Sequence, residues 1–196
     1  MNTGDARTEI LRSIRAHLAM SAPSDLSDPF DLSVRASPCS SVAISLVQLF
    51  KQNLEAVDGH CIVVENQTEV DETLKRLTEG KRIATPDASR VDLFKFDVGV
   101  TNAQAGIAET GTLVLDSSVE RNRLVSLVPP IHIAILDASR IFQTLGETLT
   151  ALQSGDEVSP AITFITGPSR TADIELTLAI GVHGPQELYV IINQNT

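Results

Sequence analysis

Apolar positions along the chain change repeatedly between helical spacing and short β-branched runs. One stripe at helical spacing extends from Ala43 to Val57, and a second extends from Val70 to Leu77. Residues 61–64 and 82–86 are brief apolar runs of the kind found in buried strands. This α, β, α, β order with short connections predicts an α/β fold with a mainly parallel sheet flanked by helices.

The pattern continues toward the C-terminus. Further strands are expected at residues 98–101, the second half of 107–116, 131–136, 161–165 and 188–192. A helix is expected over residues 139–152, ended by Gly155. After the 161–165 run, a Gly-Pro break and a hydroxyl-rich stretch predict a turn and a helix start over 169–175. Such a helix start offers backbone N–H groups to an anion, although a simple helix cap needs the same residue types.

The N-terminal part has a different character. Residues 5–19 have the apolar spacing of an amphipathic helix, and residues 21–38 are rich in Ser, Pro and Asp. We therefore expect two parts: an N-terminal helical arm with a Ser/Pro-rich linker over 1–38, and a compact domain over 39–196.

Composition narrows the classes of partner and compartment. The formal net charge is −10 and the 15 basic residues are scattered, which argues against nucleic acid as a partner. The apolar stretches are too short for a membrane span and the N-terminus lacks a signal-type apolar core, so a cytoplasmic protein is expected. Cys39 and Cys61 have neither metal-type nor disulfide-type spacing.

Several cofactor signatures are absent from the sequence. No phosphate loop, dinucleotide-binding glycine motif or Cys-x-x-Cys pair occurs, so no nucleotide or iron–sulfur motif points to a cofactor. The four His residues show no cluster in the sequence, and no metal site is expected.

The most informative polar stretch follows the 161–165 run. Arg170 has a planar guanidinium suited to a carboxylate or phosphate, and Ser169 and Thr171 can cap a helix or bind the same anion. Asp173 falls in the first turn of the expected helix, where the helix dipole favours negative charge. An anion site and a structural cap both remain open for these residues.

Glu109 is the most interesting carboxylate, because it lies in apolar surroundings just before an expected buried strand. A carboxylate there is paired, protonated or functional. The structural alternative is a buried Glu109 bonded to backbone N–H groups or to Arg123. His183, in a glycine-flanked turn, is accessible and able to titrate near neutrality, whereas His132 in an apolar strand is more typical of a satisfied core residue.

Four groups of residues in a fixed order resemble the LUD domain family, of the lactate utilization protein C type. These groups are Gly106-Ile107-Ala108-Glu109-Thr110-Gly111-Thr112; Arg123 with Leu127-x-Pro129 and His132; residues 167–175; and Gly181-Val182-His183-Gly184-Pro185. The resemblance extends from about residue 40 to the C-terminus, so the compact part is expected to be a LUD domain.

The resemblance implies a fold like that of the NagB, RpiA and CoA transferase group. It also implies a cluster-free subunit of a system that oxidises L-lactate to pyruvate with iron–sulfur partner proteins. In that fold group a Glu near a strand end can serve as a nucleophile in CoA transfer, which makes Glu109 a candidate by analogy.

These observations give one principal hypothesis for function and two alternatives. The principal hypothesis is a lactate-oxidising subunit that binds a small carboxylate or phosphate ligand, with Glu109 and His183 catalytic. The ligand-binding residues are then Thr110, Gly111, Arg123, Gly167, Ser169, Arg170, Thr171 and Asp173. The alternatives are an acyl or CoA transferase with Glu109 as nucleophile, and a non-catalytic assembly or regulatory protein.

Overall fold

The computed structural model describes residues 45–85, 87–120, 122–152, 159–171, 179–180 and 183–195. The predicted N-terminal helix 5–19, the linker 21–38 and the side chain of Asp173 lie outside these residues. The domain boundary at residue 39 therefore stays a prediction. In the described part of the chain, no helix is long and apolar enough to cross a bilayer.

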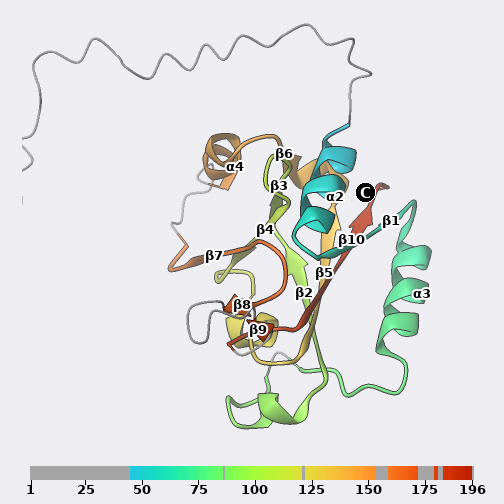
Figure 1. The fold of residues 1–196 in the computed structure, drawn as a ribbon, viewed down its shortest axis with the longest axis vertical. Helices are drawn as coiled ribbons and strands as arrows, with labels where there is room; N and C mark the ends of the chain where they lie inside the picture. Colours follow the sequence, from blue (N-terminus) through green and yellow to red (C-terminus); the bar gives the residue numbers. More distant parts are fainter. Residues whose placement is uncertain are drawn as a thin grey trace, which may run out of the picture. The chain divides into compact units, whose positions relative to one another are not determined.

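A four-stranded parallel sheet forms the centre of the described part (Figure 1). Its strands, in spatial order, are β1 (His60–Val64), β10 (Glu187–Asn193), β5 (Ile131–Asp137) and β2 (Val98–Ala103). The last strand in the sequence therefore lies between β1 and β5, and its Leu188, Val190, Ile191 and Ile192 are all buried. Strands covered on both faces read as continuous apolar runs, which explains why these segments could be predicted.

Helices cover both faces of this sheet, as predicted. On one face α2 (Leu46–Ala56) packs Phe50 and Leu54 into a cluster with alternate residues of β5 and β10. On the other face α3 (Gln67–Thr78) packs Val70 against Ile133 and Ile191. Ser45 caps α2 through a capping box with Gln48, which fixes where this helix begins. The predicted α/β architecture with a mainly parallel central sheet is confirmed.

A second, mixed sheet packs on the α2 side of the fold, and the sequence pattern did not predict it. Its strands, in spatial order, are β6 (Ile141–Phe142), β3 (Ala105–Ile107), β4 (Thr112–Asp116) and β7 (Ile162–Ile165). β3 and β4 are antiparallel and joined by a turn that ends at Gly111, whose φ of 63° favours glycine. The strand expected in the second half of 107–116 is β4, while its pairing in a hairpin with β3 and its antiparallel pairing with β7 were not predicted.

The remaining elements are short. They are η1 (Asp92–Lys95), η2 (Arg123–Ser126), η3 (Ala138–Arg140), α4 (Leu145–Leu152) and the pair β8 (Arg170–Thr171) and β9 (Ala179–Ile180). The predicted helix over 139–152 is correct only for α4, because residues 138–142 form a 3₁₀ turn and a strand. The predicted strand at 82–86 is a single bridge between Ile83 and Val98.

The predicted helix start over 169–175 is wrong at Arg170 and Thr171. These two residues form β8, which pairs antiparallel with β9. The partner strand lies about ten residues away in the sequence, so local capping signals could not reveal the pairing. The rest of the predicted helix lies outside the described residues.

Candidate functional site

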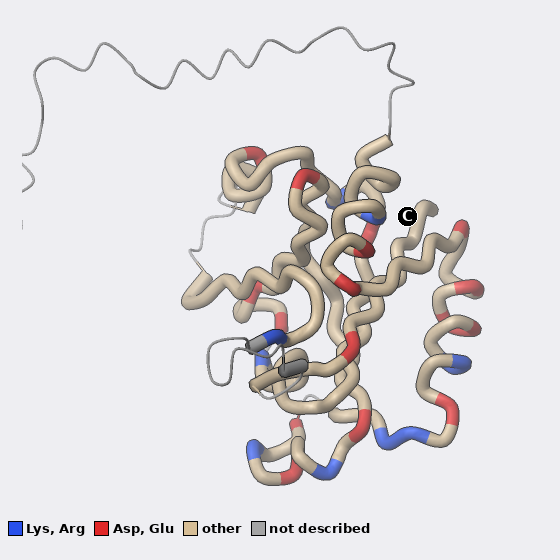
Figure 2. The backbone as a smooth tube through the Cα atoms, in the orientation of Figure 1, with Lys and Arg blue, Asp and Glu red and all other residues tan. Residues whose placement is uncertain are grey.

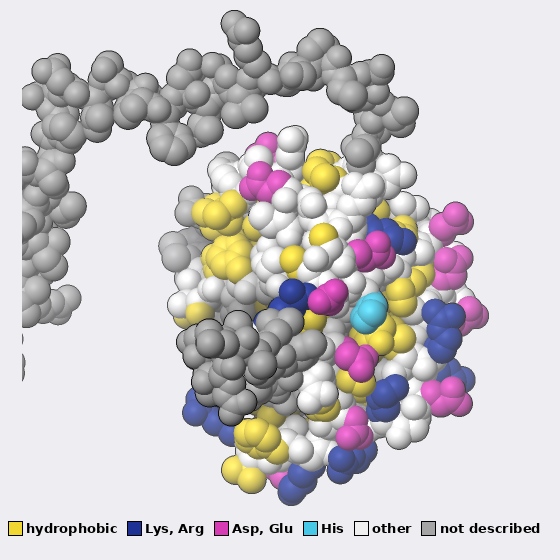
Figure 3. Space-filling model, viewed as in Figure 1, with side chains coloured by type: hydrophobic (Ala, Val, Ile, Leu, Met, Phe, Trp, Pro, Cys, Tyr) yellow, Lys and Arg dark blue, Asp and Glu magenta, His cyan; other side chains and the backbone are white. Residues whose placement is uncertain are grey.

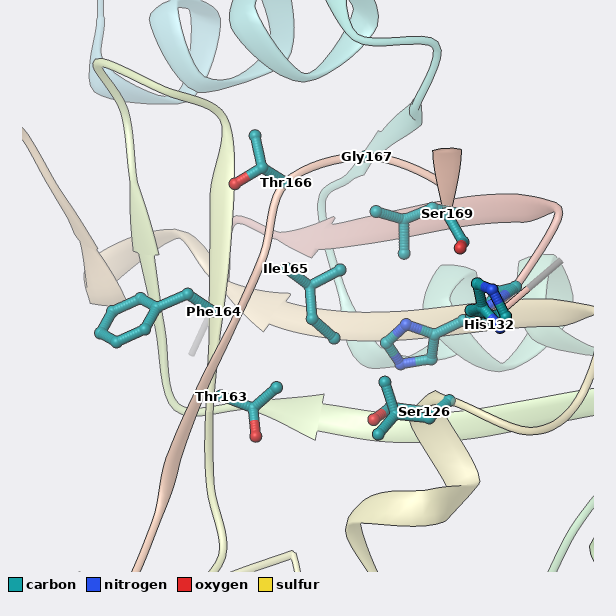
Figure 4. A pocket seen from close by; sticks show the side chains of 13 residues that line it. Ser126, His132, Thr163, Phe164, Ile165, Thr166, Gly167 and Ser169 are labelled. Carbon is teal, nitrogen blue, oxygen red and sulfur yellow. The ribbon is translucent and has the colours of Figure 1, made fainter. Parts of the chain in front are cut away.

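A small pocket lies where the starts of β5 and β10 face β7 and the loop at 183–185. Its volume is about 220 Å³, which is below the usual range for drug-sized ligands. It is lined by Ser126, Leu127, His132, Thr163, Phe164, Ile165, Thr166, Gly167, Ser169, His183, Gly184, Pro185 and Leu188. Figure 4 shows the ring of His132 extending from β5 toward Ile165, with Ser126 below it and Ser169 above it.

His132 is the unusual member of this lining. Its side chain is fully buried, and its Nε2 lies 2.8 Å from the hydroxyl oxygen of Thr101 on β2. Burial lowers the pKa of His132 to about 4, so the ring is neutral near pH 7. Its Nδ1 is buried and has no hydrogen-bond partner among the described residues. A buried polar atom without a partner costs about 1–3 kcal/mol, so this nitrogen calls for an explanation.

Strand alternation explains how His132 reaches the pocket. Side chains point to opposite faces at successive positions, so Ile131 and Ile133 face α3 while His132 faces the second sheet. Leu188 is the direct register partner of His132 on β10, and Gly99 is its partner on β2. The carbonyl of Val125 lies against Gly99, and a Cβ there would be 1.9 Å from that oxygen. Gly99 therefore lets the turn that carries Ser126 close over the sheet.

Two loops form the outer wall of the pocket. The backbone N–H of Ser169 donates a 2.9 Å hydrogen bond to the carbonyl of Pro185. Gly184 faces the Ser169 side chain so closely that a Cβ would be 3.0 Å from its Cβ. Gly167 has a φ of 78°, and a Cβ there would be 2.6 Å from the carbonyl oxygen of Val57. The contacts of Ser169 with Pro185 and Gly184 bring the 167–169 segment and the 183–185 loop together, while Gly167 lets that segment lie against the end of α2.

The structure brings three of the predicted site residues to this pocket: Gly167, Ser169 and His183. His183 is exposed at the rim, whereas His132 is buried inside. The expectation that His132 is a satisfied core residue is right about its burial and about Nε2, which contacts Thr101, whereas Nδ1 has no partner among the described residues. Sequence reasoning also did not select Ser126 and Thr163, which no local motif distinguishes.

Glu109 and Thr110 lie in a neighbouring hollow of about 280 Å³, which shares Phe164 and Thr166 with the pocket. Apolar side chains of Ile107, Leu145 and Phe164 do line this hollow, but Glu109 itself is exposed and not buried, because the turn that Gly111 closes directs it to solvent. Its Oε1 accepts a 3.3 Å hydrogen bond from the backbone N–H of Leu145. Glu109 and His183 are therefore not residues of one pocket.

Threonine hydroxyls form a chain in this hollow. Thr112 lies 2.7 Å from the hydroxyl of Thr110 and 2.6 Å from that of Thr166. Each of these polar groups has a partner within the protein, which distinguishes the hollow from the pocket of His132.

The remaining predicted binding residues that the structure describes make contacts within the protein outside the pocket of His132. Arg170 pairs with the carboxylate of Asp58 at the surface. Arg123 is exposed at the start of η2, where its carbonyl accepts a 2.8 Å hydrogen bond from the hydroxyl of Ser126. Gly111 lies against α2, since a Cβ there would be 2.3 Å from the backbone nitrogen of Leu54. The backbone of Thr171 pairs with β9.

The described residues that line the pocket of His132 carry no Lys, Arg, Asp or Glu side chain. No described cluster of three His, Cys, Asp or Glu could hold a metal ion. Elsewhere, Figure 2 shows basic positions spread along the described trace, and Figure 3 shows acidic and basic side chains interspersed on one face. Cys61 is buried, and burial raises the pKa of its thiol to about 12.

Comparison with known proteins identifies the family of the chain. The LUD domain family model matches residues 84–193, which is more than half of the chain. The chain belongs to the LUD domain family. It is 34% identical over 148 residues to a protein named lactate utilization protein C from an Exiguobacterium species, covering 71% of this chain and 64% of that protein. It is 42% identical over 107 residues to an uncharacterized protein of Neisseria meningitidis, covering 54% of this chain and 46% of that protein.

The LUD domain also has a structural relative. A crystal structure of a DUF162 family protein from Deinococcus radiodurans matches with a TM-score of 0.59 at 23% identity, covering 75% of this chain and 95% of that one. This similarity supports the fold. The chain spans about half to two thirds of the length of the two curated relatives described above.

Proposed function

We propose that this LUD domain protein is a component of a lactate utilization system and that the pocket of His132 binds the small organic acid on which the system acts. The relative from Exiguobacterium bears the name lactate utilization protein C. The observation that carries the proposal is that all the pocket residues, from Ser126 to Leu188, lie within the region matched by the family model. The pocket is small, and leucine and isoleucine side chains share its lining with polar groups, as a short organic acid requires.

The chemistry of lactate oxidation adds partners to the proposal. Conversion of L-lactate to pyruvate releases two electrons and two protons, so an electron acceptor is needed. The sequence has two cysteines, fewer than the four thiolates that usually hold an iron–sulfur cluster. The family resemblance implies iron–sulfur partner proteins, and we propose these as the electron acceptors. We also propose a cytoplasmic location.

The residues that would bind the ligand differ from those predicted from the sequence. The anion site predicted at Arg170 is replaced, because this guanidinium is engaged by Asp58. His183 and the Ser169 hydroxyl at the rim are the groups that would meet the carboxylate of the ligand. That carboxylate would stay near solvent, since no positive side chain among the described residues lines the interior of the pocket to offset its desolvation.

Gene deletion in the organism that carries the protein tests this function. We expect the deletion strain to lose growth on L-lactate as sole carbon source and to keep growth on pyruvate. Normal growth of the deletion strain on L-lactate would contradict the proposed system.

Complementation then tests the pocket. Thr163→Phe adds bulk to a lining residue, and Val119→Phe adds bulk at a site that is 61% exposed. We expect Val119→Phe to restore growth on L-lactate and Thr163→Phe to fail, with both proteins equally folded by circular dichroism. Full complementation by Thr163→Phe would remove this pocket from the proposal.

A further inference from the structure

The buried nitrogen of His132 is the feature of the pocket that most needs a ligand. The hydroxyl oxygen of Thr101 lies 2.8 Å from Nε2. Nδ1 is on a different edge of the ring and has no hydrogen-bond partner among the described residues. Buried polar groups are almost always hydrogen-bonded, to protein or to ordered water. His132 is at the same time a lining residue of the pocket, so a ligand there can supply the missing partner.

The surroundings limit the chemistry of that partner. Leu188, Ile165 and Leu127 contribute apolar walls, and no charged carboxylate, ammonium or guanidinium group of the described residues lines the cavity. A neutral imidazole in such surroundings suits an uncharged oxygen better than a carboxylate, which would lose hydration without a counter-charge. The group that reaches His132 is therefore an alcohol or a carbonyl.

The hydroxyl of Thr101 lets the His132–Thr101 hydrogen bond form with either tautomer of the imidazole. A threonine hydroxyl can donate to Nε2 or accept from it, so the imidazole can carry its proton on either nitrogen. With the proton on Nδ1, the ring donates to a carbonyl oxygen. With the proton on Nε2, Nδ1 accepts from an alcohol. A change of tautomer thus fits the site to the reduced and oxidised forms of one substrate.

We propose that Nδ1 of His132 hydrogen-bonds the 2-oxygen of a short 2-hydroxy or 2-oxo acid, and that the hydroxyl of Thr101 accommodates the ring tautomer that each form requires. The 2-oxygen lies inside beside His132, and the carboxylate of the ligand lies at the rim near Ser169 and His183. The inference deepens the proposed function by naming the ligand class and the group that recognises it.

Binding of three probes tests the inference. L-lactate and pyruvate have the 2-oxygen, and propionate lacks it. We expect the wild-type protein to bind L-lactate and pyruvate about tenfold more tightly than propionate in calorimetric titrations, the ratio that one hydrogen bond supplies. The ¹⁵N resonance of His132 Nδ1 is expected to move with L-lactate and pyruvate and to stay in place with propionate.

Two matched variants separate this contact from a folding effect. The amide of Asn lies near the position of Nδ1 in histidine, whereas the amide of Gln lies near that of Nε2. We therefore expect His132→Asn to keep most of the preference over propionate and His132→Gln to reduce it to about equal affinity. The two polar replacements remove one contact each, so a general loss of stability would affect both.

The outcomes are separable from those of the growth experiment. Equal affinity of the wild type for all three acids, absence of binding for all three, or an undiminished preference in His132→Gln would overturn the inference. Each result would leave the role in lactate utilization to be decided by the deletion strain.

Discussion

The two neighbouring hollows that share Phe164 and Thr166 differ in how their polar atoms are paired. In the hollow of Glu109, three threonine hydroxyls pair with each other and the carboxylate accepts a backbone N–H while open to solvent. In the pocket of His132, a fully buried ring nitrogen has no partner among the described residues. Residue type alone made Glu109 the stronger candidate. The pairing of atoms in the fold makes His132 the stronger one.

Of the changes in the two hollows, Gly99→Ala is expected to lower the free energy of unfolding most, because it disturbs the wall of the His132 pocket. The added Cβ would meet the carbonyl oxygen of Val125 at 1.9 Å, and a backbone atom cannot move away as a flexible side chain can. We expect a loss of at least about 3 kcal/mol in the free energy of unfolding, measured by urea denaturation.

Gly146→Ala is the control for this substitution. Gly146 lies within α4, and the nearest atom to an added Cβ is the Thr144 hydroxyl oxygen at 3.9 Å. Alanine there should stabilise the protein by about 0.5–1 kcal/mol, because glycine weakens a helix. Equal stability of the two variants would show that the turn beside Gly99 can move without cost.

The titration of His132 is expected to have an intermediate effect on the free energy of unfolding. Its pKa is about 4 in the folded protein against 6.5 for a free side chain. The unfolded chain therefore binds the proton first as pH falls, and the free energy of unfolding decreases between pH 6.5 and pH 4. The decrease attributable to this group is about 3 kcal/mol at pH 4, with its full stabilising contribution present above pH 6.5.

Denaturation of wild type and His132→Gln across this pH range isolates the effect. Glutamine does not titrate, so the difference in unfolding free energy between the two proteins should change by about 3 kcal/mol from pH 7 to pH 4. Parallel pH profiles would mean that His132 is more accessible to protons than its burial indicates.

Apolar spacing in the sequence was sufficient to predict the central layers of the fold. The runs at 61–64, 131–136 and 188–192 became strands because the strands of a sheet that helices cover on both faces are mostly apolar. The second sheet was not predictable in this way, since β3 and β6 are short and their pairing links distant parts of the chain. Arg170 was misassigned because Ser, Thr and Gly suit a helix cap and a turn equally well.

The site was less predictable than the fold. Sequence motifs identified Gly167, Ser169 and His183, which meet at one pocket. They could not show that Nδ1 of His132 has no partner among the described residues, because this depends on which distant segments surround the ring in the fold. Nor could they place the pocket, which lies at the start of β5, whereas open α/β sheets usually bind ligands at the carboxyl ends of their strands.

The smallest effect is expected from Glu109→Gln, in the other hollow. Glu109 is exposed and accepts one 3.3 Å hydrogen bond, which a glutamine amide oxygen can also accept. The change in unfolding free energy should therefore stay within about 0.5 kcal/mol, as for most surface substitutions.

Growth on L-lactate should also be restored fully by the Glu109→Gln variant in the deletion strain. Mass spectrometry after incubation with acyl-CoA should show no adduct on Glu109 of the wild-type protein. An adduct at this carboxylate, or failed complementation by a folded Glu109→Gln protein, would move the chemistry to the hollow of Glu109. The functional residue would then be a carboxylate that is already paired and open to solvent, and not the buried Nδ1 of His132, which has no partner among the described residues.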